Sequence, residues 1–218
     1  MYRICFLLVT FLFVQIRSQE NLIYQDPPEE ILKLVDVTLP PRVLMDDKKN
    51  YMIYLYRDTY KTIKELSEKE MRLAGLRINP KINIGSRVNY FKNIKISDLR
   101  KKKSKAKNIK GMPSSPRLSN IKWSPDQTKI AMTNTTAEGV ELWYLDLIKG
   151  RMKRLTSPNL NANLGDVINW FHDGKSMLVK FVPPKIPKIL EKDKLTPVGP
   201  RISTNDGKKA QNRTYQDL

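Results

Sequence analysis

The segment that most constrains the fold is residues 121–156, where four short strand-like runs alternate with three turn signals. The run "IKW" alternates apolar and polar side chains, and "SPDQ" follows it with turn chemistry, because proline presets φ and Ser and Asp bond back to nearby backbone. Further runs follow at 129–133, 140–147 and 151–156. Short strands at this spacing are typical of antiparallel meanders. Four strands in about 40 residues match one blade of a β-propeller.

The pattern recurs along the chain. Trp123 and Trp170 each end a strand-like run and precede a turn with an aspartate, a basic residue and an apolar run. An earlier copy, "RVLMDDKKNYMIYLY", has Met45 in the tryptophan position, with its third strand expected within 88–99 and its fourth near 108–112. We therefore predict an all-β fold: a partial β-propeller of about two and a half four-stranded antiparallel blades, with a short helical insertion.

Helical spacing is expected in two places. Residues 58–78 carry Ile63, Leu66 and Met71 at partial helical spacing, with Gly75 as a stop, which predicts one or two short helices. Before the blades, prolines and acidic residues precede an apolar stretch, as at the start of a helix, which predicts a helical turn or two.

Five parts make up the predicted organisation. They are a signal peptide (1–18), a lead-in segment (19–40), a first blade with the helical insertion and a basic loop (41–113), a second blade (114–158), and the incomplete start of a third blade with a proline-rich loop (159–218). A single blade leaves both faces of its sheet uncovered, so neighbouring blades are required. On this reading the sequence ends within a propeller.

The first residues resemble a secretory leader. A cationic start, an apolar run over 4–14 and a small residue, Ser18, at the expected cleavage site predict a signal peptide. The apolar run is shorter than the roughly 20 residues of a membrane span, although an uncleaved anchor is the alternative. The only cysteine, Cys5, lies inside it, so the mature chain would have no disulfide. We expect an exported protein, periplasmic or extracellular, without stable membrane insertion after cleavage.

The chain is strongly basic, with a formal net charge of +18 from 40 Lys and Arg residues against 22 Asp and Glu residues. The densest run, "RKKKSKAK", begins at Arg100 and belongs to a basic loop that ends at Lys110. It has no interleaved aromatic residues for base stacking and adjoins no helix-turn-helix or zinc pattern. We interpret it as a solvated loop between two strands and expect no nucleic-acid partner.

Recognisable catalytic chemistry is absent from the sequence. No Gly-x-Ser-x-Gly elbow, Cys/His zinc cluster or Gly-rich phosphate loop occurs. The only histidine, His172, is expected to be a solvated turn residue. Adjacent carboxylates such as Asp46 and Asp47 point apart in a strand or turn, which favours a turn or cap role. The same holds for the pair that begins at Glu29. We therefore predict no catalytic, cofactor-binding or metal-binding residue and no cofactor. Trp123, Trp143 and Trp170 are predicted to pack blades.

The order of motifs resembles a known family. The motifs are "YQDPPEEILKLVD", "LAGLRINPKINIGSR", "IKWSPDQTKIAMTN", "VELWYLDL", "VPPKIPK", "PVGPRIS" and "NRTYQDL". In this order they are similar to the start of serine peptidases of the prolyl oligopeptidase family, and within it to the glutamyl endopeptidase-like group of bacteria and plant chloroplasts. The resemblance covers nearly the whole chain after the leader. The blade motif alone is shared by many propellers, whereas the combination is more specific.

This resemblance implies an N-terminal propeller that restricts access to a C-terminal α/β-hydrolase domain with a Ser, Asp and His triad. It implies that Leu218 lies before that domain, that peptide substrates would be bound through the missing domain, and that this chain alone is inactive. The basic surface suggests a preference for acidic peptides.

Two other readings stay open. One is a stand-alone secreted basic binding module without catalytic activity, and the other is a binder of anionic polymers whose affinity falls steeply with salt.

Overall fold

The computed structural model of the protein describes residues 23–73 and 75–185, and the sheets lie in one compact unit that begins at Glu29. The predicted signal peptide with Cys5 and the motifs "PVGPRIS" and "NRTYQDL" lie outside the described residues. No helix among those residues is long and apolar enough to cross a membrane.

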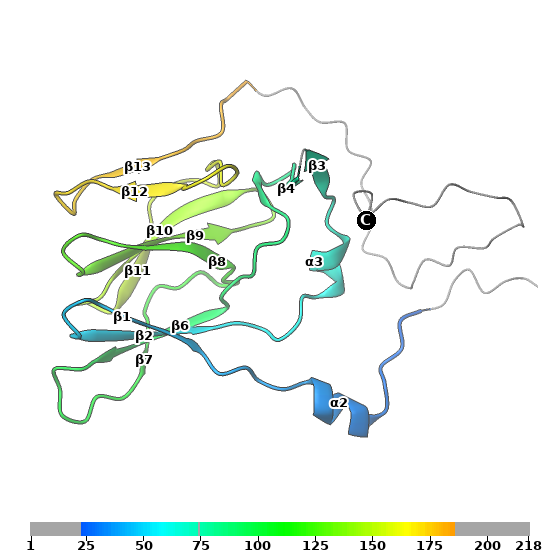
Figure 1. Ribbon diagram of the computed structural model, residues 1–218, viewed down its shortest axis with the longest axis horizontal. Helices are drawn as coiled ribbons and strands as arrows, with labels where there is room; N and C mark the ends of the chain where they lie inside the picture. The colour runs from blue at the N-terminus through cyan, green and yellow to red at the C-terminus, as the bar shows by residue number, and fades with distance from the viewer. Residues whose placement is uncertain (1–22, 74, 186–218) are drawn as a thin grey trace, which may run out of the picture. The chain divides into compact units, whose positions relative to one another are not determined.

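The first sheet is a four-stranded antiparallel meander in the order β1-β2-β6-β7 (Figure 1). Its strands are β1 (Arg42–Met45), β2 (Tyr51–Tyr56), β6 (Asn93–Asp98) and β7 (Lys107–Asn108). In β2, buried side chains alternate with half-buried ones, because successive residues of a strand point to opposite faces. The register places Ile53 beside Leu44 on one side and Ile96 on the other, so that apolar side chains share one face. The third and fourth strands lie close to where the sequence places them.

A second meander follows in the order β8-β9-β10-β11. Its strands are β8 (Leu118–Trp123), β9 (Lys129–Thr135), β10 (Val140–Asp146) and β11 (Arg151–Arg154). Each of the four runs predicted within 121–156 contains or overlaps one of these strands. β8 starts earlier than predicted, and its register against β9 shifts between Ser119 and Lys122, where Asn120 has a φ of 49°.

The third sheet is the hairpin of β12 (Ile168–Trp170) and β13 (Met177–Val179). The turn between the two strands holds His172, which is exposed, as predicted. Two four-stranded sheets and this hairpin confirm the prediction of an all-β chain that forms a partial propeller.

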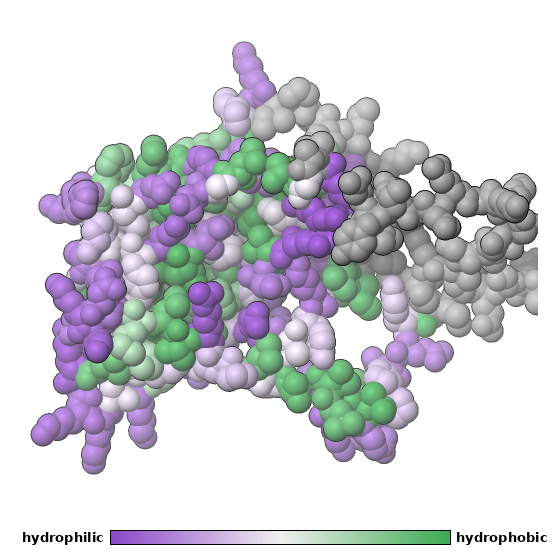
Figure 2. All heavy atoms as spheres, viewed as in Figure 1, coloured by the Kyte–Doolittle hydropathy of each residue, from purple (hydrophilic) through white to green (hydrophobic). Residues whose placement is uncertain are grey.

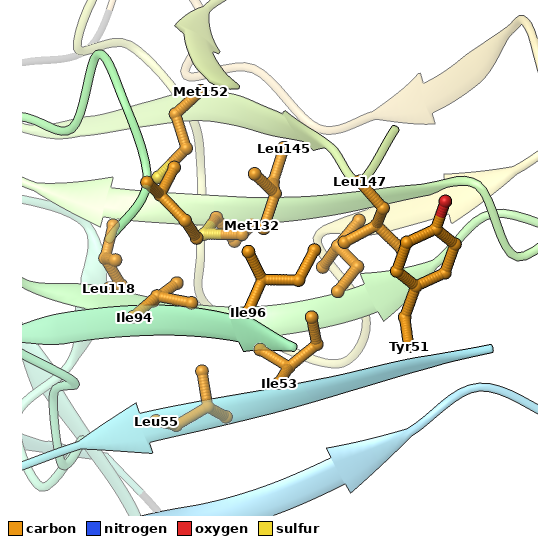
Figure 3. Close-up of a cluster of buried hydrophobic side chains, with 12 residues drawn as sticks. Tyr51, Ile53, Leu55, Ile94, Ile96, Leu118, Met132, Leu145, Leu147 and Met152 are labelled. Atoms are coloured by element: carbon orange, nitrogen blue, oxygen red, sulfur yellow. The ribbon is translucent and has the colours of Figure 1, made fainter. Parts of the chain in front are cut away.

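The sheets pack face to face around two cores. The first core lies between the first and second sheets (Figure 3) and consists of Tyr51, Ile53, Leu55, Ile94, Ile96, Ile109, Leu118, Ile130, Met132, Leu145, Leu147 and Met152. The second core lies on the other face of the second sheet and consists of Ile82, Ile84, Ala131, Val140, Leu142, Leu160, Val167 and Ile168. Strand alternation explains the division, since Ile130 and Met132 enter the first core and Ala131 the second.

The three tryptophans pack at the margins of these cores, which confirms their predicted role. Trp123 and Trp143 border the first core, and Trp170 borders the second. The indole Nε1 of Trp170 also donates a hydrogen bond to the main-chain oxygen of Lys122 at 3.1 Å, which links the hairpin to the second sheet. The outer faces carry exposed apolar side chains, including Val43 of β1 and Leu178 of β13.

The insertion between β2 and β6 confirms one short helix and departs from the prediction in the segment after it. It contains one helix, α3 (Ile63–Ser67), but the sequence after it forms a three-stranded antiparallel sheet rather than further helix. The strands of this sheet are β3 (Met71–Leu73), β4 (Leu76–Asn79) and β5 (Ile84–Gly85). Gly75, expected to end a helix, lies in the β3–β4 turn with a φ of +86°, a value that glycine adopts without strain. β5 reaches the second core, where Ile84 forms a bridge with Ala162.

The predicted helical turn before the blades is also present. It is α2 (Glu29–Val35), in which Lys33 forms an ion pair with Glu29 one turn earlier, at 2.9 Å. Glu29 and Glu30 lie in the first turn of this helix, where negative charge is favourable beside the positive end of the helix dipole.

Candidate functional site

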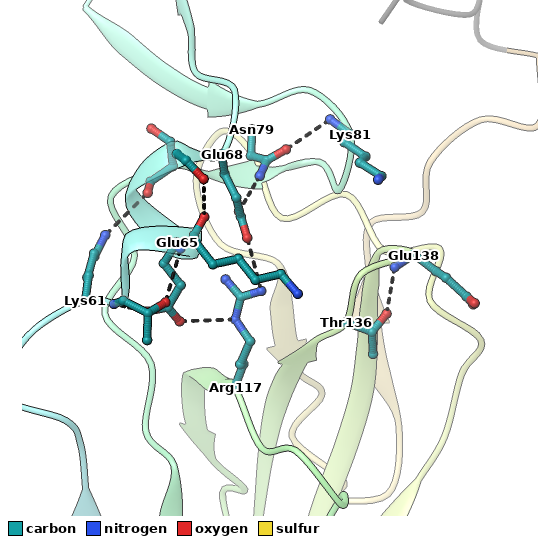
Figure 4. A network of polar contacts seen from close by, with 12 residues as sticks. Lys61, Glu65, Glu68, Asn79, Lys81, Arg117, Thr136 and Glu138 are labelled. Atoms are coloured by element: carbon teal, nitrogen blue, oxygen red, sulfur yellow. Dashed lines mark hydrogen bonds and ion pairs between the residues drawn. The ribbon is translucent and has the colours of Figure 1, made fainter. Parts of the chain in front are cut away.

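A cluster of charged side chains joins the insertion to the second sheet (Figure 4). We call it the rim cluster and define it as Glu65, Glu68, Lys92, Arg117 and the ring of Tyr90. Glu65 lies in α3 and Glu68 directly follows that helix. Lys92 comes just before β6, and Arg117 comes just before β8. The rim cluster therefore connects segments that are distant in sequence.

Glu65 is positioned by the first turn of α3. Its main-chain nitrogen donates to Thr62 Oγ1 at 3.2 Å, and Thr62 nitrogen donates to Glu65 Oε2 at 3.2 Å, which together form a capping box. Its other oxygen, Oε1, lies 3.3 Å from Lys92 Nζ and 3.6 Å from Arg117 Nε. Burial raises the pKa of Glu65, but the Thr62 amide, Lys92 and Arg117 outweigh it, so the pKa lies below its ordinary value.

Arg117 is the central cation of the rim cluster. Its Nη1 atom donates to Glu68 Oε1 at 3.5 Å, and its guanidinium carbon lies 4.4 Å from the centre of the Tyr90 ring. The side chain is 20% exposed. Its main-chain nitrogen donates to Asn134 Oδ1 at 3.0 Å, which holds the residue against β9. An arginine suits this position because its planar guanidinium can bind carboxylates through its N–H groups while its face stacks on an aromatic ring.

Burial of the phenol dominates at Tyr90 and raises its pKa, although the nearby Arg117 opposes the change. The ring therefore stays neutral and serves as an apolar platform for the guanidinium.

Glu68 extends the network to the small sheet of the insertion. Its Oε2 atom accepts a hydrogen bond from Asn79 Nδ2 at 2.7 Å. Asn79, in β4, is buried, and its Oδ1 atom accepts from the main-chain nitrogen of Lys81 at 3.1 Å. Both polar ends of this buried amide thus have partners, as buried polar groups require.

A second anionic centre lies within the insertion itself. Glu70 Oε1 accepts from Arg77 Nη1 at 2.8 Å and from Arg72 Nε at 3.0 Å, while Oε2 accepts from the hydroxyl of Ser86. The Ser86 hydroxyl is the largest influence, and with the two arginines it lowers the pKa of Glu70 to about 2. These bonds cross from the start of β3 to the segment after β5, so they fix the fold of the insertion.

The geometry of the rim cluster is suited to holding the insertion against the second sheet. The depression lined by Lys61, Glu65, Glu68, Ser86, Tyr90 and Arg117 has room for about one water molecule. Its cations and carboxylates neutralise one another. Within residues 23–73 and 75–185, no group of three or more His, Cys, Asp or Glu side chains could hold a metal ion. We therefore assign the rim cluster a structural role at the edge of the sheets.

The residues considered from the sequence lie elsewhere. Asp46 closes the β1–β2 turn, where its Oδ1 atom accepts from the main-chain nitrogen of Tyr51 at 2.6 Å, in agreement with the predicted turn role. Asp47 pairs with Gln127 in the neighbouring sheet. His172 lies in the β12–β13 turn. The structure does not bring these side chains together with the rim cluster.

Sequence reasoning missed the rim cluster, although one local signal was present. The spacing of Thr62 and Glu65 is that of a capping box, and it indicates where α3 starts. No local pattern connects Glu65 with Arg117, because that contact depends on how the insertion folds back over the sheets.

Two curated proteins are similar to most of this chain. A probable chloroplastic glutamyl endopeptidase of Oryza sativa subsp. japonica is 27% identical in an alignment of 211 residues that covers 89% of this chain and 22% of that protein. A second, from Arabidopsis thaliana, is 28% identical in an alignment of 206 residues that covers 89% of this chain and 21% of that protein. The chain thus spans about a fifth of the length of these relatives. No protein-family model matches the chain.

Among solved structures, an acylaminoacyl peptidase in complex with Z-Gly-Gly-Phe-chloromethyl ketone is similar at 18% identity with a TM-score of 0.38. The match covers 74% of this chain and 20% of that one. The acylaminoacyl peptidase of Pyrococcus horikoshii gives the same values.

The stacked four-stranded meanders define the class of the fold as a partial propeller. Similarity over 89% of the chain confirms the resemblance drawn from its motifs: this chain is related to a portion, about a fifth in length, of glutamyl endopeptidase-like peptidases of the prolyl oligopeptidase family.

Proposed function

We propose that this chain forms the substrate-gating propeller portion of an exported serine peptidase of the glutamyl endopeptidase type. The observation that carries the proposal is the similarity over 89% of the chain to relatives named glutamyl endopeptidase, in which the matched region is about a fifth of the protein. In such a protein the sheets would control which peptides reach a separate catalytic domain.

The packing of the sheets supports a role in access control. A second sheet that is covered on both faces by apolar cores resists deformation, because protein interiors are close-packed. The rim cluster ties the insertion to that stack through Arg117. Rigidly packed sheets, with the insertion held in place by the rim cluster, can keep bulky substrates from reaching a catalytic domain.

Sequencing the genomic locus downstream of the Leu218 codon is the direct test. We expect further blade-like repeats and a Gly-x-Ser-x-Gly motif, in frame or after one frameshift. A downstream region that encodes neither would refute the proposal and favour a stand-alone binding protein.

An activity assay then tests gating. The protein encoded by the extended reading frame should hydrolyse short peptides and spare a folded protein, and replacement of its nucleophilic serine by alanine should abolish hydrolysis. Loosening the rim with Arg117→Ala should raise cleavage of a long unfolded polypeptide relative to a short peptide. An unchanged ratio would argue against gating by this rim.

Two finer proposals concern substrate and location. The net charge of +18 would attract acidic peptides, so cleavage of an acidic peptide should exceed that of a neutral one at low salt and lose this advantage at high salt. We also propose that the leader is removed on export, so the mature protein from a cell envelope fraction should begin within a few residues after Ser18. Equal cleavage of both peptides, or a mature protein that retains its first residues, would contradict these proposals.

A further inference from the structure

Five of the turns that connect neighbouring strands, β1–β2, β6–β7, β8–β9, β10–β11 and β12–β13, lie at one end of the sheets, opposite the insertion (Figure 1, left). Hydrogen bonds show their proximity: Leu99 nitrogen donates to Asn50 oxygen at 2.8 Å, and Leu147 nitrogen donates to Thr128 oxygen at 3.0 Å. A side chain at Gly174 would lie 3.4 Å from the carboxylate carbon of Asp126. We call this surface the turn end. It consists of residues 46–50, 99–107, 124–128, 147–150 and 171–175.

Acidic side chains in the turn end, or in the last strand residue before it, accept hydrogen bonds from the turns themselves. Asp98 accepts from the guanidinium of Arg100, and Asp126 accepts from the hydroxyls of Ser124 and Thr128. Asp146 accepts from the main-chain nitrogen of Lys149. Their negative charge therefore lies close to the backbone and is partly neutralised.

The lysines of the turn end extend into solvent. Lys102, Lys103 and Lys105 are exposed, and within the described part of the chain none of them forms an ion pair. The sequence has no acidic residue between Asp98 and Asp126. It has none between Asp146 and Asp166 either.

The fold joins these two acid-free stretches. Lys110 forms a bridge with Arg151, and its main-chain nitrogen donates to Gly150 oxygen at 3.0 Å. The two basic segments, distant in the sequence, thus share one surface, and hydrophilic side chains gather at this end of the sheets (Figure 2, left).

Two apolar side chains project from the same surface. Ile148, at the tip of the β10–β11 turn, is 71% exposed, and Phe171, in the β12–β13 turn, is 53% exposed. Single exposed apolar residues are ordinary. Here, however, they occupy turns of the same end of the sheets as the exposed lysines, a combination that suits the boundary between lipid headgroups and acyl chains.

We propose that the turn end binds the surface of an anionic lipid bilayer. The lysines would attract the headgroup phosphates, and Ile148 and Phe171 would enter the headgroup layer without spanning it. Nucleic acid fits less well, because the free charges are mostly lysines rather than bidentate arginines, and an isoleucine cannot stack on bases. The proposal does not depend on peptidase activity.

Vesicle co-sedimentation of the full chain tests it. Phosphatidylcholine vesicles with phosphatidylglycerol at roughly a third of the lipid should bind at least about tenfold more protein than pure phosphatidylcholine vesicles. The pure vesicles also account for any binding through the apolar run at 4–14. Binding should weaken as salt rises from about 0.05 M to about 0.5 M.

Two variants assign the binding to the turn end. The triple change Lys102→Glu, Lys103→Glu and Lys105→Glu should lower anionic-vesicle binding at least about tenfold, and Ile148→Ser should lower it severalfold. Each alters exposed positions, and its thermal transition should match that of the parent chain.

The matched control reverses the charge of three exposed lysines in the insertion, with the substitutions Lys64→Glu, Lys69→Glu and Lys81→Glu. It changes the net charge by the same amount and should retain most of the binding. An equal loss in this control would overturn the proposal, as would equal binding to neutral and anionic vesicles. So would tighter binding to duplex DNA than to the anionic vesicles at the same salt, which would assign the surface to nucleic acid.

Discussion

Gln127 and Asp47 form two hydrogen bonds across the junction of the first and second sheets. Gln127 Nε2 donates to Asp47 Oδ2 at 3.0 Å, and the main-chain nitrogen of Asp47 donates to Gln127 Oε1 at 3.4 Å. The pair links equivalent turns of successive sheets. The pair therefore shows that the β1–β2 turn of the first sheet lies next to the β8–β9 turn of the second sheet.

This exposed pair should contribute little to stability. We expect Gln127→Ala to lower the free energy of unfolding in urea by less than about 1 kcal/mol, because water replaces exposed hydrogen bonds at little cost. A double-mutant cycle with Asp47→Ala should give a coupling energy of about 0.5 kcal/mol. A loss above about 2 kcal/mol would show that the pair is needed for sheet docking.

The first core should dominate stability instead. Met132 is 1% exposed and lies among side chains of both sheets. We expect Met132→Ala to lower the free energy of unfolding by about 2–5 kcal/mol, since it removes apolar contacts and leaves a cavity. The matched control Leu178→Ala, at a position 61% exposed, should cost no more than about 0.5 kcal/mol. Similar losses in both variants would contradict this assignment.

The rim cluster should depend on Arg117. We expect Arg117→Ala to lower the free energy of unfolding by about 2–4 kcal/mol, because it leaves Glu65 and Glu68 partly buried without their shared cation. Arg117→Lys should recover part of this loss but not the stacking on Tyr90. The control is Arg87→Ala, whose side chain is 69% exposed and 3.8 Å from Glu70, and it should have almost no effect.

Acid should destabilise the insertion through Glu70. Its folded-state pKa of about 2 lies below the ordinary 4.5, so the ionised group contributes stability above about pH 4.5. That contribution is lost as the pH falls from about 4.5 to about 2. Glu70→Gln should therefore be less stable than the parent chain at neutral pH and lose less stability over this interval. Urea titrations at several pH values measure the free energy of unfolding of both proteins. If this free energy fell in parallel for the two proteins between about pH 4.5 and about pH 2, Glu70 would not be the group responsible.

Within residues 23–73 and 75–185, the basic loop should be the first site of tryptic cleavage. Residues 100–103 and 105–108 are exposed, and the loop joins β6 to the two-residue strand β7. Brief digestion should cut between Arg100 and Lys107, as expected for an exposed loop rich in lysine. N-terminal sequencing of the fragments identifies the position. A first cut inside the second sheet would contradict the packing described here.

The sequence predicted the strands well where local pattern and turn chemistry agree. Around Trp123 and Trp170, period-two alternation and aspartate-containing turns coincide, and strands end at these residues. The insertion was harder to predict, because the apolar residues after Leu66 fit a helix and a hairpin almost equally well. The hairpin is stabilised by the pairing of β4 with β5 and by Glu70, and both are contacts that a local window does not contain.

The sequence by itself determined the repeat of strand, turn and strand, the basic loop and the likeness to glutamyl endopeptidases, because each of these is encoded in neighbouring residues. Tertiary structure alone decided that Arg117 meets Glu65 and that Lys110 lies beside Arg151. The physical reason is that burial of the two cores sets how the sheets stack, and the stacking then determines which distant charges become neighbours.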